Sequence, residues 1–140
     1  MKVFKFGGAS VKDAGAVINV GKVLKRYENE PLIVVVSAMG KTTNALESIM
    51  QAYGANDKLL STELIQESEA YHQTIIKDLF PNDSREISTE IAQIFADLTA
   101  KCEQQFEGEY DYHYDQIISL GEVISTKIIA AYLNTIQFKS

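Results

Sequence analysis

The sequence has little cysteine, little basic charge and no long apolar run, and each absence excludes a class of protein. The single cysteine among 140 residues, Cys102, excludes an internal disulfide bond and a metal site built from several cysteines. Thirteen basic and nineteen acidic side chains give a net charge of −6, which argues against non-specific binding to nucleic acid or an anionic membrane surface. No apolar run approaches the ~20 residues of a membrane span. No secretory signal follows Lys2. We therefore expect a cytoplasmic protein with neither a nucleic-acid nor a membrane partner.

Linkers, low-complexity tracts and short internal repeats are also absent from the sequence. Hydrophobic residues make up 46% of the chain, which is enough for a packed core. A chain of this length and composition is one domain or part of one.

The N-terminal third of the sequence predicts a strand, a helix and a second strand. Polar and apolar residues alternate from Lys2 to Phe6, which indicates a short strand with one buried face. Apolar residues then recur three or four positions apart over residues 13–28, the spacing of an amphipathic helix. The continuous run from Leu32 to Val36 is typical of a strand that a parallel sheet buries on both faces. The three elements together predict a βαβ unit.

The remaining sequence is mainly helical in pattern. Helices are expected at about residues 44–53, 58–80, 84–106 and 115–134, with a connection at 108–114 and the start of a strand at 136–138. Two clear strands are too few for so much helix, because each helix needs sheet or another helix to cover. We therefore expect an α/β protein in which residues 1–140 form the N-terminal portion of a longer domain.

The most informative segment joins the first strand to the first helix. Here Lys5 lies at the end of the strand, Gly7 and Gly8 follow directly, and the helical pattern begins a few residues later. A glycine pair lets the backbone approach a ligand closely and point its N–H groups outward, and a helix N-terminus favours negative charge. With the lysine beside it, this arrangement predicts an anion site, with phosphate as the anion, although a plain turn would also accommodate two glycines.

A second loop, residues 37–43, follows the second strand. Because ligands of open α/β sheets bind beyond the carboxyl ends of the strands, we expect this loop and the glycine loop to share one rim. A P-loop is excluded, since its first glycine would fall at Val35, inside the strand. Lys41 is then best interpreted as a solvated lysine. Ser37, Thr42 and Thr43 are either ligand groups or turn and cap hydroxyls, and the sequence does not decide between these roles.

The last predicted helix carries a small polar stripe. Ser119, Glu122, Ser125 and Thr126 share one face by helical spacing, and this face lines a pocket or is simply exposed. The two histidines, His72 and His113, have no partner at metal-ligand spacing and are interpreted as core or surface residues. No nucleophile with a paired base is found, so the sequence predicts no covalent catalysis.

Three segments together resemble the aspartate kinase family. Residues 5–11 (Lys-Phe-Gly-Gly-Ala-Ser-Val) are similar to the KFGG[TA]SV signature of that family, and residues 34–44 and 118–125 are similar to its second and third blocks. The blocks come in the family's order and span nearly the whole chain. Relatives such as acetylglutamate and uridylate kinases vary the first block more. The one departure is Ala9, where threonine is commoner.

The resemblance implies a three-layer α/β/α sandwich of the amino-acid kinase type, here truncated at its C-terminal end. It also implies transfer of the ATP γ-phosphate to the β-carboxylate of L-aspartate, the first step toward lysine, threonine and methionine. Carried over by position, Lys5 is implied to stabilise charge on the transferring phosphoryl group. Gly7, Gly8 and Ser10 are implied to contact phosphate, and Ser37 to lie between phosphate and acceptor.

For the acceptor, the resemblance implies that Thr43 and Glu122 hold aspartate, with Glu122 facing its ammonium group. The adenine site, the arginine for the α-carboxylate, the residues that hold Mg²⁺ and the regulatory domains are all expected beyond Ser140. No metal-binding residue is therefore expected within the chain, and a homo-oligomer is expected. Two alternatives stay open: a related kinase with another acceptor, and a non-catalytic helical binding module.

Overall fold

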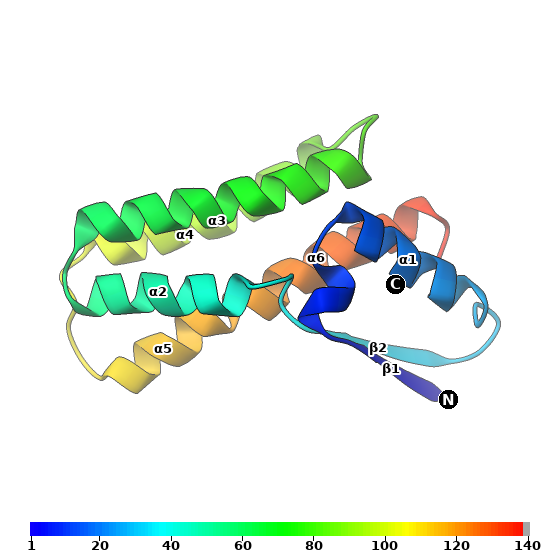
Figure 1. The fold of residues 1–140 in the computed structure, drawn as a ribbon, viewed down its shortest axis with the longest axis horizontal. Coiled ribbons are helices and arrows are strands. Elements are labelled where there is room, and N and C mark those ends of the chain that lie inside the picture. The colour runs from blue at the N-terminus through cyan, green and yellow to red at the C-terminus, as the bar shows by residue number, and fades with distance from the viewer. Residues whose placement is uncertain (139–140) are drawn as a thin grey trace.

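A two-stranded sheet and a layer of helices make up residues 1–138, the part of the chain that the computed structural model describes (Figure 1). The elements in chain order are β1 (Lys2–Phe6), the 3₁₀ helix η1 (Gly8–Val11), α1 (Ala14–Lys25), β2 (Leu32–Val36), α2 (Thr42–Gly54), α3 (Lys58–Leu79), α4 (Arg85–Glu103), α5 (Tyr110–Ile118) and α6 (Leu120–Thr135). Both strands have the predicted bounds, and the expected α/β class is confirmed.

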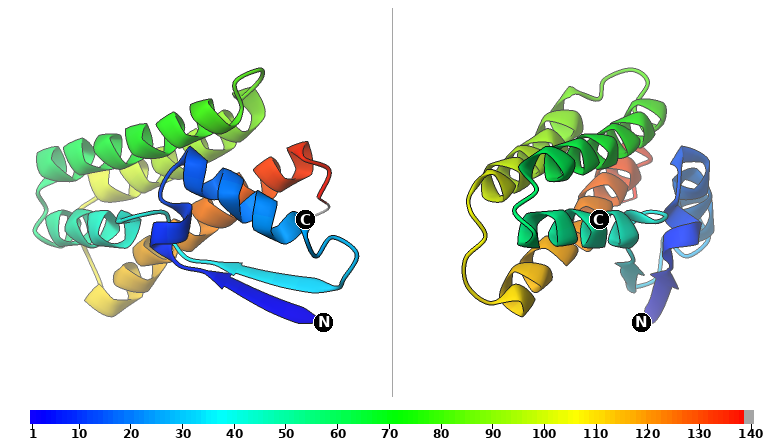
Figure 2. Two further views of the ribbon diagram at one scale, coloured as in Figure 1. Left: turned by 45° about the vertical axis from the view of Figure 1, so that its right-hand side comes forward. Right: turned by 60° about the vertical axis from the view of Figure 1, so that its left-hand side comes forward.

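The two strands pair in parallel, with Lys2 opposite Leu32 and Phe6 opposite Val36. This pairing confirms the predicted βαβ unit. The prediction that β2 is buried on both faces is wrong for the described residues, because Ile33 and Val35 are 45% and 44% exposed. The alternate residues Leu32, Val34 and Val36 pack against the core instead and face α6 across a cavity. Helices α1 and α6 lie on one side of the sheet (Figure 2).

One face of the two-stranded sheet is not covered by any helix among the described residues. Val3, Ile33 and Val35 expose apolar surface there, and unpaired strand edges flank it. We expect the 140-residue chain on its own to form dimers or larger oligomers, because uncovered apolar sheet surface tends to acquire a partner. Light scattering across a concentration series measures this, with Ile33→Lys as the variant that should shift the mass toward the monomer. A strictly monomeric mass at every concentration would contradict the expectation.

The helices pack as a layer beside and above the sheet. Neighbouring helices α3 and α4 form a long hairpin, α2 lies against α3, and α6 runs through the middle of the molecule (Figures 1 and 2). On α6, Ile124 and Ile128 are fully buried in the core. Cys102 of α4 is also buried, as expected for a small apolar residue, and this burial raises the pKa of its thiol to about 11.

Two sequence predictions near the C-terminal end are wrong. Residues expected as a connection form the first turns of α5, where Tyr114 donates a hydrogen bond to Glu47 of α2 at 2.9 Å. Residues 136–138 form no strand, because Gln137 takes a positive φ of 60° and the chain turns at the end of α6. Both outcomes depend on tertiary contacts and backbone geometry that local periodicity does not report.

The segment Tyr110–Thr135 is long and apolar enough, by length and composition alone, to cross a membrane. It comprises α5 and α6, with Ser119 between them. Its apolar residues Ile117, Ile124 and Ile128 are fully buried in the core. Packing of these three side chains in the core therefore accounts for part of the apolar character of the segment.

Candidate active site

The two predicted loops lie against each other at one rim of the sheet (Figure 1). The N–H of Ser37 donates to the carbonyl of Phe6 at 2.9 Å, and the N–H of Gly40 donates to the carbonyl of Gly8 at 3.0 Å. Pairing of the two chain segments thus continues past the ends of the strands. The expectation that both loops share the rim at the carboxyl ends is confirmed.

The two glycines of the first loop have different structural roles. A Cβ atom on Gly8 would lie 2.8 Å from the carbonyl oxygen of Gly40 and 2.9 Å from that of Ala38, so no larger residue fits. A Cβ atom on Gly7 would meet nothing within 4 Å. Gly8 therefore allows the close packing of the two loops, whereas Gly7 leaves an open stretch of backbone that a ligand could approach.

The helix N-terminus predicted to help bind the anion is already occupied. Asp13 is the N-cap of α1, and its carboxylate accepts a hydrogen bond from the N–H of Ala16 at 2.8 Å. A carboxylate in this position satisfies the helix terminus and repels a second anion. Residues 8–11 instead form η1, which is fastened by the Ser10 N–H bond to the Gly7 carbonyl (2.9 Å) and by the fully buried Val11.

Helix α6 joins the same rim. The Ser125 hydroxyl donates to the carbonyl of Ser37 at 2.7 Å. One turn earlier, a Cβ atom on Gly121 would lie 2.8 Å from the Cβ of Ala38, so glycine is needed for the close approach of α6 to the second loop. Glu122 follows Gly121 directly and is exposed. The three segments that resemble one family are therefore in contact in the fold.

The hydroxyl groups of this rim divide into engaged and free ones. Thr42 donates to the Met39 carbonyl at 2.5 Å, Ser119 to the Gln116 carbonyl at 3.2 Å, and Ser125 to Ser37. These three hydroxyls stabilise the loop and the helix. Of the two roles predicted for Thr42, the structure favours a turn hydroxyl over a ligand group. Across residues 1–138, five predicted site residues have polar side-chain groups with no protein partner: Lys5, Ser10, Ser37, Thr43 and Glu122.

Lys5 occupies the open side of the sheet. The alternation along β1 places it on the same face as Val3, opposite Val35 of β2, and its side chain is exposed. It is two residues from Gly7, so its ammonium group is within reach of the backbone that Gly7 leaves open. Lys41, by comparison, is exposed at the N-cap of α2, in agreement with its interpretation as a solvated lysine.

Sequence reasoning missed a contribution from α3. Tyr71 donates a hydrogen bond to the carbonyl of Lys12, and Nε2 of His72 lies 3.3 Å from the Thr42 hydroxyl oxygen. His72 is fully buried, as expected for a core histidine, and burial lowers its pKa. No spacing rule connects α3 with the loops, which lie 59 positions earlier in the case of Lys12. The only available signal was a polar pair, Tyr71-His72, in a long amphipathic helix.

The predicted site residues offer few ligands for a metal ion. Within the described residues, no three His, Cys, Asp or Glu side chains gather in one place. Divalent magnesium is held in proteins by carboxylates together with substrate phosphates. Glu122 is the one carboxylate among the predicted site residues, so these residues alone do not form a metal-binding cluster.

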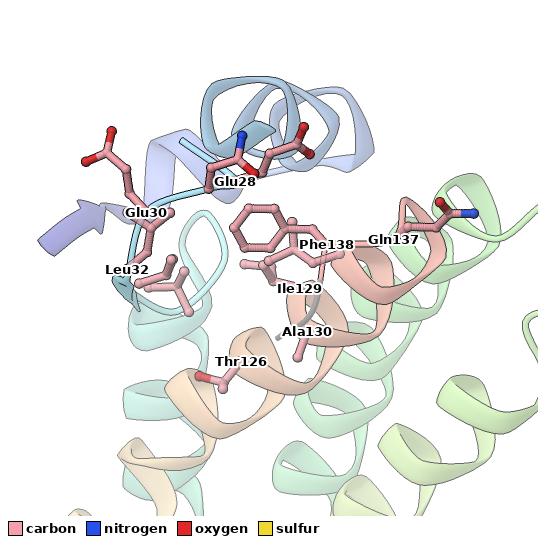
Figure 3. Close-up of a pocket in the computed structure, with 12 residues that line it drawn as sticks. Glu28, Glu30, Leu32, Thr126, Ile129, Ala130, Gln137 and Phe138 are labelled. Atoms are coloured by element: carbon pink, nitrogen blue, oxygen red, sulfur yellow. The ribbon is translucent and has the colours of Figure 1, made fainter. Parts of the chain in front are cut away.

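A separate apolar cavity of about 650 Å³ lies between β2 and α6 (Figure 3). Its walls include Leu32, Ile129 and Phe138, with Glu28 and Glu30 at its edge. Thr126 of the predicted polar stripe lines it, but none of the residues assigned to phosphate or aspartate does, and its described walls contain no cationic side chain. This cavity is therefore unsuited to a phosphate and is distinct from the candidate site.

Comparison with solved structures supports the fold. The structure of Escherichia coli aspartokinase III with lysine and aspartate superposes with a TM-score of 0.81 at 24% sequence identity, over 99% of this chain and 30% of that one. The same enzyme with aspartate and ADP gives a TM-score of 0.78 at 22% identity, over 98% and 29% of the two chains. At this level of identity the likeness concerns the fold, and it confirms the predicted amino-acid kinase type.

Comparison of sequences leads to the family. Aspartokinase 1, chloroplastic, of Arabidopsis thaliana is 35% identical over 144 residues, which is 99% of this chain and 24% of that protein. The bifunctional aspartokinase/homoserine dehydrogenase 2 of E. coli (strain K12) is 29% identical over 95% of this chain and 16% of its own length. The chain thus spans about a quarter or less of the relatives it matches. The amino acid kinase family matches residues 1–140 in full, and the chain belongs to this family.

Proposed function

We propose that residues 1–140 are the N-terminal portion of the catalytic domain of an aspartate kinase. The whole protein would transfer the ATP γ-phosphate to the β-carboxylate of L-aspartate and form β-aspartyl phosphate. The observation that carries the proposal is the contact of the glycine loop, the second loop and the Gly121–Ser125 turn of α6 at one rim. The sequence relatives, which are aspartokinases, support the choice of acceptor.

The phosphate half of the proposed site consists of residues from β1 and its loop. Phosphoryl transfer needs positioning and charge stabilisation more than covalent chemistry. The ammonium group of Lys5 would neutralise charge that develops on the transferring oxygens. The open backbone at Gly7 and the free hydroxyl of Ser10 would contact phosphate, while Gly8 keeps the loop in place through its packing on Gly40. Magnesium would supply further charge neutralisation at the phosphates, from residues outside those described here.

The acceptor half would be formed by the second loop and α6. The free hydroxyls of Ser37 and Thr43 would hydrogen-bond the acceptor, with Ser37 nearest to the phosphoryl group. Glu122 would pair with the ammonium group of aspartate, since its carboxylate is exposed and unengaged beside the loop. With this division, the phosphoryl donor and the acceptor would lie on adjacent loops that are hydrogen-bonded to each other, and transfer needs such proximity.

The biological setting follows from the same proposal. β-Aspartyl phosphate formation would be the first step toward lysine, threonine and methionine. The enzyme would act in the cytoplasm as a homo-oligomer, with ATP as the phosphoryl donor.

The proposal predicts activity in the whole protein and none in the isolated chain. ATP-dependent formation of aspartyl hydroxamate should be measurable for the full-length protein. The 140-residue chain should show none, because the adenine contacts and the residues that hold Mg²⁺ are expected elsewhere, so the γ-phosphate is not positioned. Glutamate and N-acetylglutamate serve as control acceptors. Preference for either over aspartate would refute the choice of acceptor, and hydroxamate formation by the isolated chain would refute the division of the site.

A further inference from the structure

Helix α3 carries none of the predicted ligand groups, yet two of its consecutive residues contact both loops of the candidate site. Tyr71 reaches the chain just after η1, and His72 reaches the first residue of α2. Neither contact is needed to form α3 itself, whose N-terminus is capped by Asp57. The pair therefore has a role in the arrangement of the loops.

The oxygen of Tyr71 touches both loops at once. It donates its proton to the carbonyl of Lys12 at the end of the first loop. On its other side it lies so near Gly40 that a Cβ atom there would be 2.5 Å away. Gly40 in turn donates its N–H to Gly8, which closes a ring of contacts from Tyr71 through one loop to the other. One phenolic oxygen thus contacts both segments, in addition to the backbone hydrogen bonds that join them.

Neighbouring groups hold Tyr71 in this position as a neutral donor. Burial, and then the nearby charge of Asp13, raise the pKa of the Tyr71 phenol, so the proton stays in place near pH 7. The His72 ring lies edge-on to that of Tyr71, with ring centres 5.0 Å apart. His72 is itself fixed by Nδ1, which donates to the Ser68 carbonyl at 2.7 Å.

The hydrogen bond matters because the ring has room to move. Tyr71 lines a cavity of about 510 Å³ together with Lys12, Lys41 and Leu64. A ring without the hydroxyl group would keep its apolar contacts but lose its attachment to Lys12. It could then turn toward the cavity, and the loops would be joined by their backbone hydrogen bonds without the support of Tyr71.

We propose that Tyr71 is a positioning residue, which sets the distance between the glycine loop and the second loop and thereby the alignment of phosphoryl donor and acceptor. This inference rests on the proposed function. Tyr71 contacts no substrate group; it acts through Lys12 and Gly40. Misalignment of two bound reactants lowers the rate of transfer while each reactant still binds, so kcat and not KM should report the loss.

The test uses Tyr71→Phe in the full-length protein. We expect kcat to fall by about tenfold, the scale of one lost hydrogen bond together with a small misalignment, while the KM values for ATP and aspartate change less than about twofold. Tyr114→Phe is the matched control, because it also removes a tyrosine hydroxyl bonded to a protein acceptor, but on α5. Its kcat should equal that of the unmodified protein.

A second measurement does not depend on the reaction. The probes are the amides of Ser10 and Gly40, which are hydrogen-bonded within and between the two loops. In hydrogen–deuterium exchange on the full-length protein, both amides should exchange several-fold faster in Tyr71→Phe than in the unmodified protein. Their exchange rates should not change in Tyr114→Phe. Unchanged exchange, or a raised KM with unchanged kcat, would overturn the positioning role. Absence of aspartate phosphorylation by the unmodified protein would refute the proposed function, and the exchange experiment would still decide what Tyr71 does to the loops.

Discussion

Replacement of Lys5 by alanine in the full-length protein should lower kcat for aspartate phosphorylation by about a hundredfold or more, the usual scale for loss of one preorganised electrostatic contact. Lys5 is suited to this role because its ammonium group is exposed on the open face of β1 and has no partner among residues 1–138. Negative charge moves onto the phosphoryl oxygens during transfer. Lys5 should therefore stabilise the transition state more than the bound substrates.

Lys2→Ala provides the matched control, since it removes a lysine from the same strand. Lys2 pairs with Glu30 at 2.8 Å at the opposite end of β1, away from the glycine loop. Steady-state kinetics should show an unchanged kcat for Lys2→Ala. If Lys5→Ala raised the KM for ATP and left kcat intact, Lys5 would bind the phosphoryl donor equally in the ground state and the transition state. Its proposed catalytic role would then be wrong.

The sequence predicts the regular elements well where a short-range pattern determines them. The bounds of β1 and β2 are those expected from alternation and from a branched apolar run. The environment of β2 is less predictable, because five apolar residues in a row do not say whether a helix covers each face. Within residues 1–138 only one face is covered, and Ile33 stays partly exposed.

The candidate site shows the same limit. Because the two strands are parallel, the sequence predicts that the loops after them lie at the same edge of the sheet. The sequence does not predict that Gly8 allows the close packing of the two loops while the backbone at Gly7 stays accessible. Nor does it predict that the Thr42 hydroxyl donates a hydrogen bond to the Met39 carbonyl. Those distinctions depend on which atoms meet across the fold. The contact of Tyr71 with Lys12, 59 positions away, belongs to this class as well.

Replacement of Glu122 by glutamine tests the acceptor half of the site. The amide keeps the size of the side chain and removes its charge, and Glu122 makes no hydrogen bond or ion pair within residues 1–138 that the change would break. The ammonium group of aspartate is charged before and after transfer, so an ion pair with it contributes equally to the ground state and the transition state. Loss of such a pair should mainly raise KM.

We therefore expect Glu122→Gln to raise the KM for aspartate by roughly ten- to a hundredfold, the scale of a lost charge-assisted hydrogen bond, with kcat and the KM for ATP nearly unchanged. Glu63→Gln on α3 is the control, since Glu63 is also an exposed helical carboxylate but lies on an element with no predicted ligand group. Steady-state kinetics with each substrate varied in turn separates the two constants. If both variants have the aspartate KM of the unmodified protein, Glu122 is an ordinary carboxylate on an exposed helix face, and the assignment of the ammonium group to α6 is wrong.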